Sequence, residues 1–167
     1  MGRSIGAIEG LPVLDLGRRV ADELGTSPDL ALVAVPEADY RRVEARVACQ
    51  VLDHAVAQGA VVALGSGCLG DPRIGLRLEE LRLVHDRSYQ IVALACATRV
   101  LATRNGLDAP RSVALGTVHH QFVQMLHERQ ARCRELADTI IDTSATTPEE
   151  AGEQVIRAVE AGFSHHS

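Results

Sequence analysis

The sequence is almost without aromatic side chains. Trp is absent, and Phe, Tyr and Trp together make up 2% of the 167 residues. Apolar residues nevertheless account for 46% of the chain, and a chain of this length can bury a substantial core. The core of the folded protein must therefore be built from Val, Leu, Ala and Ile.

Further absences exclude whole classes of protein. The chain has no excess of positive charge, and its net charge of -5 argues against nucleic acid as the main partner. No apolar run approaches the roughly 20 residues of a membrane span, and no signal peptide is visible. We therefore expect a single domain over residues 1–167, located in the cytoplasm, with neither a nucleic-acid nor a membrane partner.

Paired cysteines are also missing. The chain has no C-x-x-C pair, and its 4 cysteines are scattered at Cys49, Cys68, Cys96 and Cys133. This pattern indicates reduced thiols rather than disulfides or a zinc site. Cys68 is a candidate nucleophile, but no base is evident for it, and a small core residue is the plainer interpretation.

The most informative stretch of the chain is VVALGSGC, residues 61–68. The short apolar run is typical of a buried parallel strand, and Gly65 and Gly67 would let the backbone turn sharply at its carboxyl end. Ligands of open α/β sheets bind outside these strand ends. We therefore place the site here, with Ser66 either donating a hydrogen bond to the ligand or only forming the turn.

Strands and helices alternate along the rest of the chain. The pattern predicts strands at 11–16, 61–64, 89–95 and 139–142, and helices at 17–24, 37–58, 71–84, 98–104, 117–137 and 148–161. Residues 30–35 fit either a strand or a helix. Pro36 and Pro148 suit first-turn positions, and Thr147 suits a helix cap. The alternation predicts a three-layer α/β/α fold around a short parallel sheet.

Histidines on the 117–137 helix raise the question of a metal site. His120 and His127 are seven residues apart and share a helical face, next to His119. No carboxylate pairs with them at a spacing suited to a metal. We therefore expect surface or packing roles for these histidines, and no metal site.

Six motifs, in order, resemble those of shikimate kinases, which belong to the nucleoside-monophosphate-kinase group of P-loop folds. The matching segments are 11–15 (family LPFxD), 40–44 (FRxxE), 65–67 (three glycines), Arg104 with Arg111 (helix end and lid), 129–137 (RxPLYxEVA), and 142–144 with 147–148 (DTS…TP). The resemblance covers roughly residues 10–160 and implies the fold of that family.

The resemblance also implies which residues bind the substrate. In the family, the arginines matched by Arg41 and Arg129 bind the carboxylate of shikimate, and the lid arginine matched by Arg111 closes over the site. The planar fork of Arg suits a carboxylate, although both residues could equally lie on a solvated helix face. The expected substrate-binding set is Asp15, Arg41, Glu44, Gly65, Ser66, Gly67, Arg111 and Arg129, with Arg41, Arg111 and Arg129 expected to be catalytic.

Two departures from the family shape the functional expectation. The family begins with a strand and a G-x-x-x-x-G-K-[ST] loop that holds the nucleotide phosphates, whereas here only Gly2-Arg3-Ser4 remains. Gly17 stands where the family has the second Asp of its D-x-D strand. The resemblance therefore implies a degenerate member that lacks both the phosphate loop and a carboxylate at the reaction centre.

These losses lead us to expect a non-kinase enzyme. Phosphoryl transfer depends on the phosphate loop and Mg²⁺, and eliminations usually need a placed base. A pericyclic rearrangement needs only a dianion held in a reactive conformation among cations. The expected activity is a cofactor-free, chorismate-mutase-like isomerisation of a cyclohexene carboxylate, or lyase-type elimination of its enolpyruvyl group. The alternatives are a shikimate-kinase-like phosphotransferase with a non-standard nucleotide site, and a non-catalytic ligand-binding pseudo-kinase.

The absent strand also has a consequence for architecture. In the family it lies in the middle of the sheet, between the strands matched here by 61–64 and 89–95. Unpaired edges in a core leave hydrogen bonds unmade. We expect the two strands to close on each other, with a homodimer covering exposed apolar surface; the alternatives are that residues 30–35 or a partner chain fill the slot.

Overall fold

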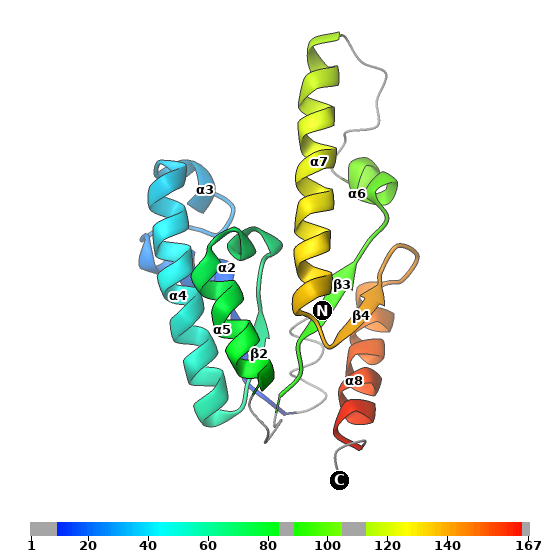
Figure 1. The fold of residues 1–167 in the computed structure, drawn as a ribbon. Helices are drawn as coiled ribbons and strands as arrows, with labels where there is room; N and C mark the ends of the chain where they lie inside the picture. The colour runs from blue at the N-terminus through cyan, green and yellow to red at the C-terminus, as the bar shows by residue number, and fades with distance from the viewer. Residues whose placement is uncertain (1–9, 84–88, 105–112, 165–167) are drawn as a thin grey trace.

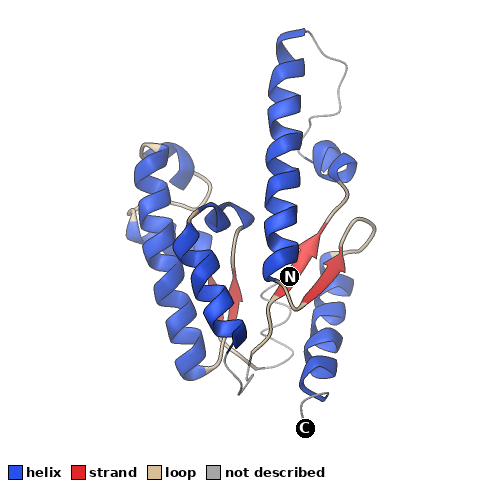
Figure 2. Ribbon diagram, in the orientation of Figure 1, coloured by secondary structure: helices blue, strands red, loops and turns tan. Residues whose placement is uncertain are grey.

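The computed structural model describes residues 10–83, 89–104 and 113–164. Helices dominate this part of the chain, and the strands are short (Figures 1 and 2). The first half contains β1 (Val13–Asp15), α2 (Leu16–Glu23), α3 (Ala31–Ala34), α4 (Glu37–Gln58), β2 (Val61–Ala63), the 3₁₀ helix η1 (Ser66–Gly70) and α5 (Pro72–Leu83). The second half contains β3 (Val92–Ala95), α6 (Thr98–Arg104), α7 (Val113–Leu136), β4 (Thr139–Asp142) and α8 (Pro148–Ser164).

The strands form two separate parallel pairs. β1 pairs with β2, with Leu14 opposite Val62, and β3 pairs with β4, with Ala93 opposite Ile140. Within the described residues no ladder joins the two pairs, which Figure 2 shows as two separate sets of red arrows. The α/β class is confirmed, but the predicted closure of β2 onto β3 is wrong. Each pair is instead held by its own helices, with α4 packed on β2, α7 on β3 and α8 on β4.

The main core lies between the first sheet and the helices around it. It is built mainly from Leu, Val, Ala and Ile side chains, as the shortage of aromatic residues predicted, and it also contains Tyr40 and Cys68. Val47, Val51 and Leu52 carry the apolar stripe of α4 into this core, where Ile74 and Leu78 of α5 meet them. Leu136 from the end of α7 belongs to the same cluster, so α7 is tied to the first half of the molecule.

The strands are less buried than the sequence predicted. All three residues of β2 are only half-buried, and Leu94 of β3 and Ile140 of β4 are 47% and 46% exposed. Two-stranded sheets leave one edge of every strand unpaired and offer few neighbours for side chains, which explains the exposure. No helix in the described ranges has the length and hydropathy needed to cross a bilayer.

Candidate substrate-binding site

A cavity of about 550 Å³ opens where η1 lies between α4 and α7. We call it the Gly67 cavity, after the residue at which its charged groups meet. Its lining comes from three parts of the chain: Glu37, Arg41, Glu44 and Ala45 of α4; residues 66–72 of η1 and the start of α5; and Met125, Glu128, Arg129 and Arg132 of α7. Segments far apart in the sequence therefore form one site.

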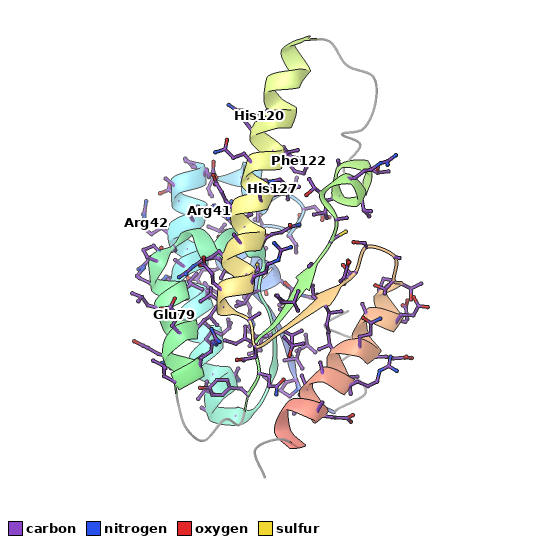
Figure 3. The ribbon with its side chains drawn as sticks, turned by 45° about the vertical axis from the view of Figure 1, so that its right-hand side comes forward. Arg41, Arg42, Glu79, His120, Phe122 and His127 are labelled. Atoms are coloured by element: carbon purple, nitrogen blue, oxygen red, sulfur yellow. The ribbon has the colours of Figure 1, made fainter. Side chains whose placement is uncertain are left out.

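Two arginines from different helices converge on Gly67. A Cβ built on this glycine would lie 3.0 Å from Nη1 of Arg41 and 3.6 Å from Nη2 of Arg129. Figure 3 shows Arg41 reaching from α4 towards α7. The structure thus brings together the two arginines and the glycine turn that the sequence placed in one site. Two guanidinium groups at one point can bind a carboxylate through paired, charge-assisted hydrogen bonds.

The glycine turn serves a different purpose from the one predicted. Gly65 has φ -78° and ψ 138°, an ordinary extended conformation. Neither Gly65 nor Gly67 is among the glycines with positive φ. The turn therefore does not depend on the left-handed region, and Gly67 matters because a side chain there would meet the arginine heads.

Glu44 holds Arg41 in place. Nη1 of Arg41 donates to Oε2 of Glu44 at 2.8 Å, and Nε of Arg41 lies 3.6 Å from Oε1 of Glu37. Glu44 is buried, at 6% exposure. Burial opposes the charge on Arg41, but the hydrogen bond and negative charge of Glu44 outweigh it and raise the pKa of Arg41. Burial, and then the charge of Glu44, likewise raise the pKa of Tyr40 above 10.0.

Arg129 differs from Arg41 in having no carboxylate partner among the residues that the structure describes. It is half-buried, and it makes no ion pair with any carboxylate in residues 10–83, 89–104 or 113–164. Its positive charge therefore remains available at Gly67, whereas that of Arg41 is partly balanced by Glu44. The cavity thus contains one cation that is fixed by carboxylates, Arg41, and one that no described carboxylate neutralises, Arg129.

Other residues of the predicted site lie elsewhere. Asp15 does not line the cavity; its Oδ1 accepts from the backbone N–H of Arg18 at 3.1 Å and caps α2. Gly65 precedes η1 and is likewise not a lining residue. Arg111 lies outside the described residues, as do the side chains of Arg104 and His119. His120 and His127 are exposed on α7 (Figure 3).

Some lining residues were missed by the sequence analysis. Glu37 precedes Arg41 by four residues, and Arg132 follows Arg129 by three, so helical spacing alone could have placed each beside a predicted arginine. Asp71 and Glu128 gave no comparable signal, because they enter the cavity only through the packing of η1 against α7.

Cys68 lies next to Gly67 but is poorly suited to nucleophilic chemistry. Its side chain is buried, at 1% exposure. Burial, followed by the charge of Glu44, raises the pKa of its thiol from 9.0 to about 12. A thiol must lose its proton to act as a nucleophile, so this environment favours the core interpretation.

Comparison with known proteins places this chain in a family. The family model described as shikimate kinase matches residues 1–160. A shikimate kinase from Thermobifida fusca (strain YX) is 27% identical over 161 residues, which is 96% of this chain and 87% of that protein. The match begins at residue 1, further towards the N-terminus than the sequence motifs indicated.

Solved structures share the fold. Shikimate kinase from Aquifex aeolicus vf5 matches with a TM-score of 0.72 at 17% identity, over 99% of this chain and 90% of that one. The enzymes from Bacteroides thetaiotaomicron and Acinetobacter baumannii match with TM-scores of 0.68 and 0.65, at 14% and 17% identity. Each of these two matches covers 94% of this chain. They cover 88% of the Bacteroides thetaiotaomicron chain and 83% of the Acinetobacter baumannii chain.

The protein thus has an α/β fold like that of solved shikimate kinases. The chain belongs to the shikimate kinase family. The expectation of a chorismate-directed isomerase or lyase is therefore wrong, because the family and its curated relative are phosphotransferases. That expectation rested on the G-x-x-x-x-G-K-[ST] pattern, which the 167 residues do not contain, and set aside the six segments that resemble family motifs.

Proposed function

We propose that the protein is a phosphotransferase of the shikimate kinase type, with a shikimate-like hydroxy acid as phosphoryl acceptor. The observation that carries this proposal is the convergence of Arg41 and Arg129 on Gly67. In a shikimate-like acid, the carboxylate would take the position between the two guanidinium groups, where each can donate in a planar fork.

The rest of the cavity suits a hydroxylated acid. Alongside the arginines it presents the carboxylates of Asp71 and Glu128, which can accept hydrogen bonds from ligand hydroxyl groups. Asp71 already pairs with Arg73, and Glu128 accepts from Gln124. A ligand hydroxyl would therefore use the carboxylate lone pairs that these contacts leave free. The Acinetobacter baumannii relative, which has the same fold, was solved in complex with shikimate.

The nucleotide side of the proposal is a non-standard one. Phosphoryl transfer needs cations on the transferring phosphate. The 167 residues contain no G-x-x-x-x-G-K-[ST] motif, and all 17 of their basic residues are arginines. Any cationic side chain that this chain contributes to the phosphates must therefore be an arginine or one of its 7 histidines in the protonated form.

Calorimetry and mass spectrometry test the two halves of the proposal. We expect the protein to bind shikimate and, with ATP and Mg²⁺, to convert it to a phosphate ester detectable as a mass increase. A charge-assisted hydrogen bond contributes about 1.5–3 kcal/mol, so Arg41→Ala and Arg129→Ala should each weaken shikimate binding about 10- to 150-fold. Arg→Lys at either position should recover only part of the loss, because the bidentate geometry is missing.

The outcomes separate this proposal from a second candidate. Binding of shikimate without any phosphate ester would support a non-catalytic ligand-binding member of the family, which the absence of the phosphate-loop motif from the printed sequence favours. Absence of both binding and transfer would overturn the proposal. His127→Ala, an exposed change on the same helix, serves as the control and should match the parent.

Two expectations about the cellular setting remain proposals. A cytoplasmic location fits four cysteines, none of which forms a disulfide, since thiols stay reduced there. A homodimer that covers exposed apolar surface, such as Leu94 and Ile140, stays a prediction.

A further inference from the structure

Arg132 lies in the wall of the Gly67 cavity, three residues after Arg129 and on the same side of α7. Its guanidinium is held at two points. Nη2 lies 3.2 Å from Oε1 of Glu79 on α5, and Nη1 lies 3.0 Å from Oε2 of Glu135 on α7 itself. Arg132 therefore links α7 to α5, and its charge is already balanced by two carboxylates.

Gly75 makes room for this link. It is a buried residue in the interior of α5, where glycine is the least favourable residue after proline. A Cβ at this position would lie 2.3 Å from Nη2 of Arg132 and 3.3 Å from its Cζ. The guanidinium thus rests against the bare backbone of α5, at a place where any other residue would push it away.

A second bridge fixes the same two helices further along. Nη1 of Arg82 donates to the backbone carbonyl of Glu135 at 2.8 Å, and its Nε lies 3.3 Å from Oδ1 of Asp138. Both bridges span an offset of 53 residues, so α5 and α7 run in the same direction with a fixed register. This register determines where along α5 and η1 each residue of α7 is placed.

Arg129 depends on that register. No carboxylate within the described ranges holds its head, so only the placement of α7 brings Nη2 to 3.6 Å from the Cβ position of Gly67. η1 leads directly into α5, which makes α5 and the glycine turn one continuous support. Arg132 lies one helical turn after Arg129 on α7. Its link to α5 is therefore suited to hold Arg129 against Gly67.

We propose that Arg132, seated on Gly75 and paired with Glu79, is a positioning residue that holds Arg129 at Gly67 for binding of the acceptor carboxylate. The part of this inference that concerns the acceptor carboxylate rests on the proposed function. The part that concerns the placement of Arg129 does not. Arg132 acts through α7. Glu79 does not line the cavity, but it holds Arg132 in place; we call Arg132, Glu79 and Gly75 the Arg132 bridge.

Two single substitutions disturb the Arg132 bridge without removing Arg132. Glu79→Gln removes the charge partner on α5, and Gly75→Ala displaces the guanidinium while improving helix propensity. In both variants we expect shikimate affinity to fall roughly 3- to 30-fold, which lies within the range of coupling energies between residues of one salt-bridge network. The midpoint of thermal unfolding for Gly75→Ala should stay at or above that of the parent, so that lost affinity is not lost folding. Arg134→Leu, an exposed change two residues along α7, is the matched control.

A ligand-free readout keeps this inference separate from the proposed function. The order parameter of the Arg129 Nε–Hε group, measured by NMR, should fall in Glu79→Gln and Gly75→Ala and stay unchanged in Arg134→Leu. If the parent does not bind shikimate, the proposed function fails while this measurement still decides the role of Arg132. Unchanged order parameters would overturn the inference. So would a large affinity loss in Arg132→Leu with none in Glu79→Gln, because Arg132 would then contact the ligand directly.

Discussion

Two glycines in the described part of this protein leave room for arginine guanidinium groups that come from another element. Gly67 receives Arg41 and Arg129, and Gly75 receives Arg132. Neither glycine has a positive φ, so the missing side chain, and not backbone freedom, explains each residue. A sequence pattern shows the glycine but not the arginine, which comes from a helix distant in the sequence.

At the same scale, the burial of Cys68 makes a prediction about its reactivity. A thiol pKa raised from 9.0 to about 12 leaves only about one thiolate in 10⁴ at pH 8, since the proton is held more tightly than in the unfolded chain. We expect iodoacetamide at pH 8 to modify the half-buried Cys49 while sparing Cys68 in the native protein, as read by peptide mass spectrometry. In urea both should react. Equal native rates for the two thiols would contradict this burial.

Among the elements, α2 depends on its cap. The Asp15 carboxylate accepts from the Arg18 N–H, and removing such a cap costs about 1 kcal/mol. Asp15→Ala should therefore lower the free energy of unfolding by about that amount in urea titrations, whereas Asp15→Asn, a comparable cap, should lose much less. Equal losses in the two variants would indicate that the charge matters for a reason other than capping.

The boundaries of helices were the most predictable feature of the fold. α4 spans Glu37–Gln58 as its apolar stripe predicted, although Pro36 lies at the N-cap and not in the first turn. The Thr147 cap of α8 is confirmed by reciprocal hydrogen bonds with Glu150, and Pro148 opens that helix. These signals are local, since both partners lie within one turn of each other.

Features that depend on distant partners were not predictable in the same way. The sequence could not decide residues 30–35, part of which forms the short helix α3. It also could not show that β2 and β3 stay apart, because pairing depends on how the helices hold each strand. In the site, the motifs brought Arg41, Arg129 and Gly67 together. The pairing of Arg132 with Glu79 could not be predicted, because the two residues are 53 apart in the sequence.

At the scale of the whole molecule, the described residues form two sheets with unequal support. The first lies against the main core, whereas Leu94 and Ile140 of the second are about half exposed. Low packing density favours local opening, so we expect amide hydrogens of β3 and β4 to exchange with deuterium faster than those of β1 and β2. Mass spectrometry of peptides from each strand would measure this. Identical protection across all four strands would instead indicate one cooperative unit.

The membership of Leu136 in the first core has a consequence for synthesis of the chain. Among the described residues, every other buried member of that cluster comes from the chain up to Leu81, with the partly buried Tyr89 and Ile91 packed against it. The ribosome must therefore add about 50 further residues before the core can close, which takes roughly 3 to 10 s at 5–20 residues per second. Throughout that interval the apolar faces of α4 and α5 and the buried Glu44 lack the helix that completes them. The nascent chain must pass this stage before Arg129 can reach Gly67.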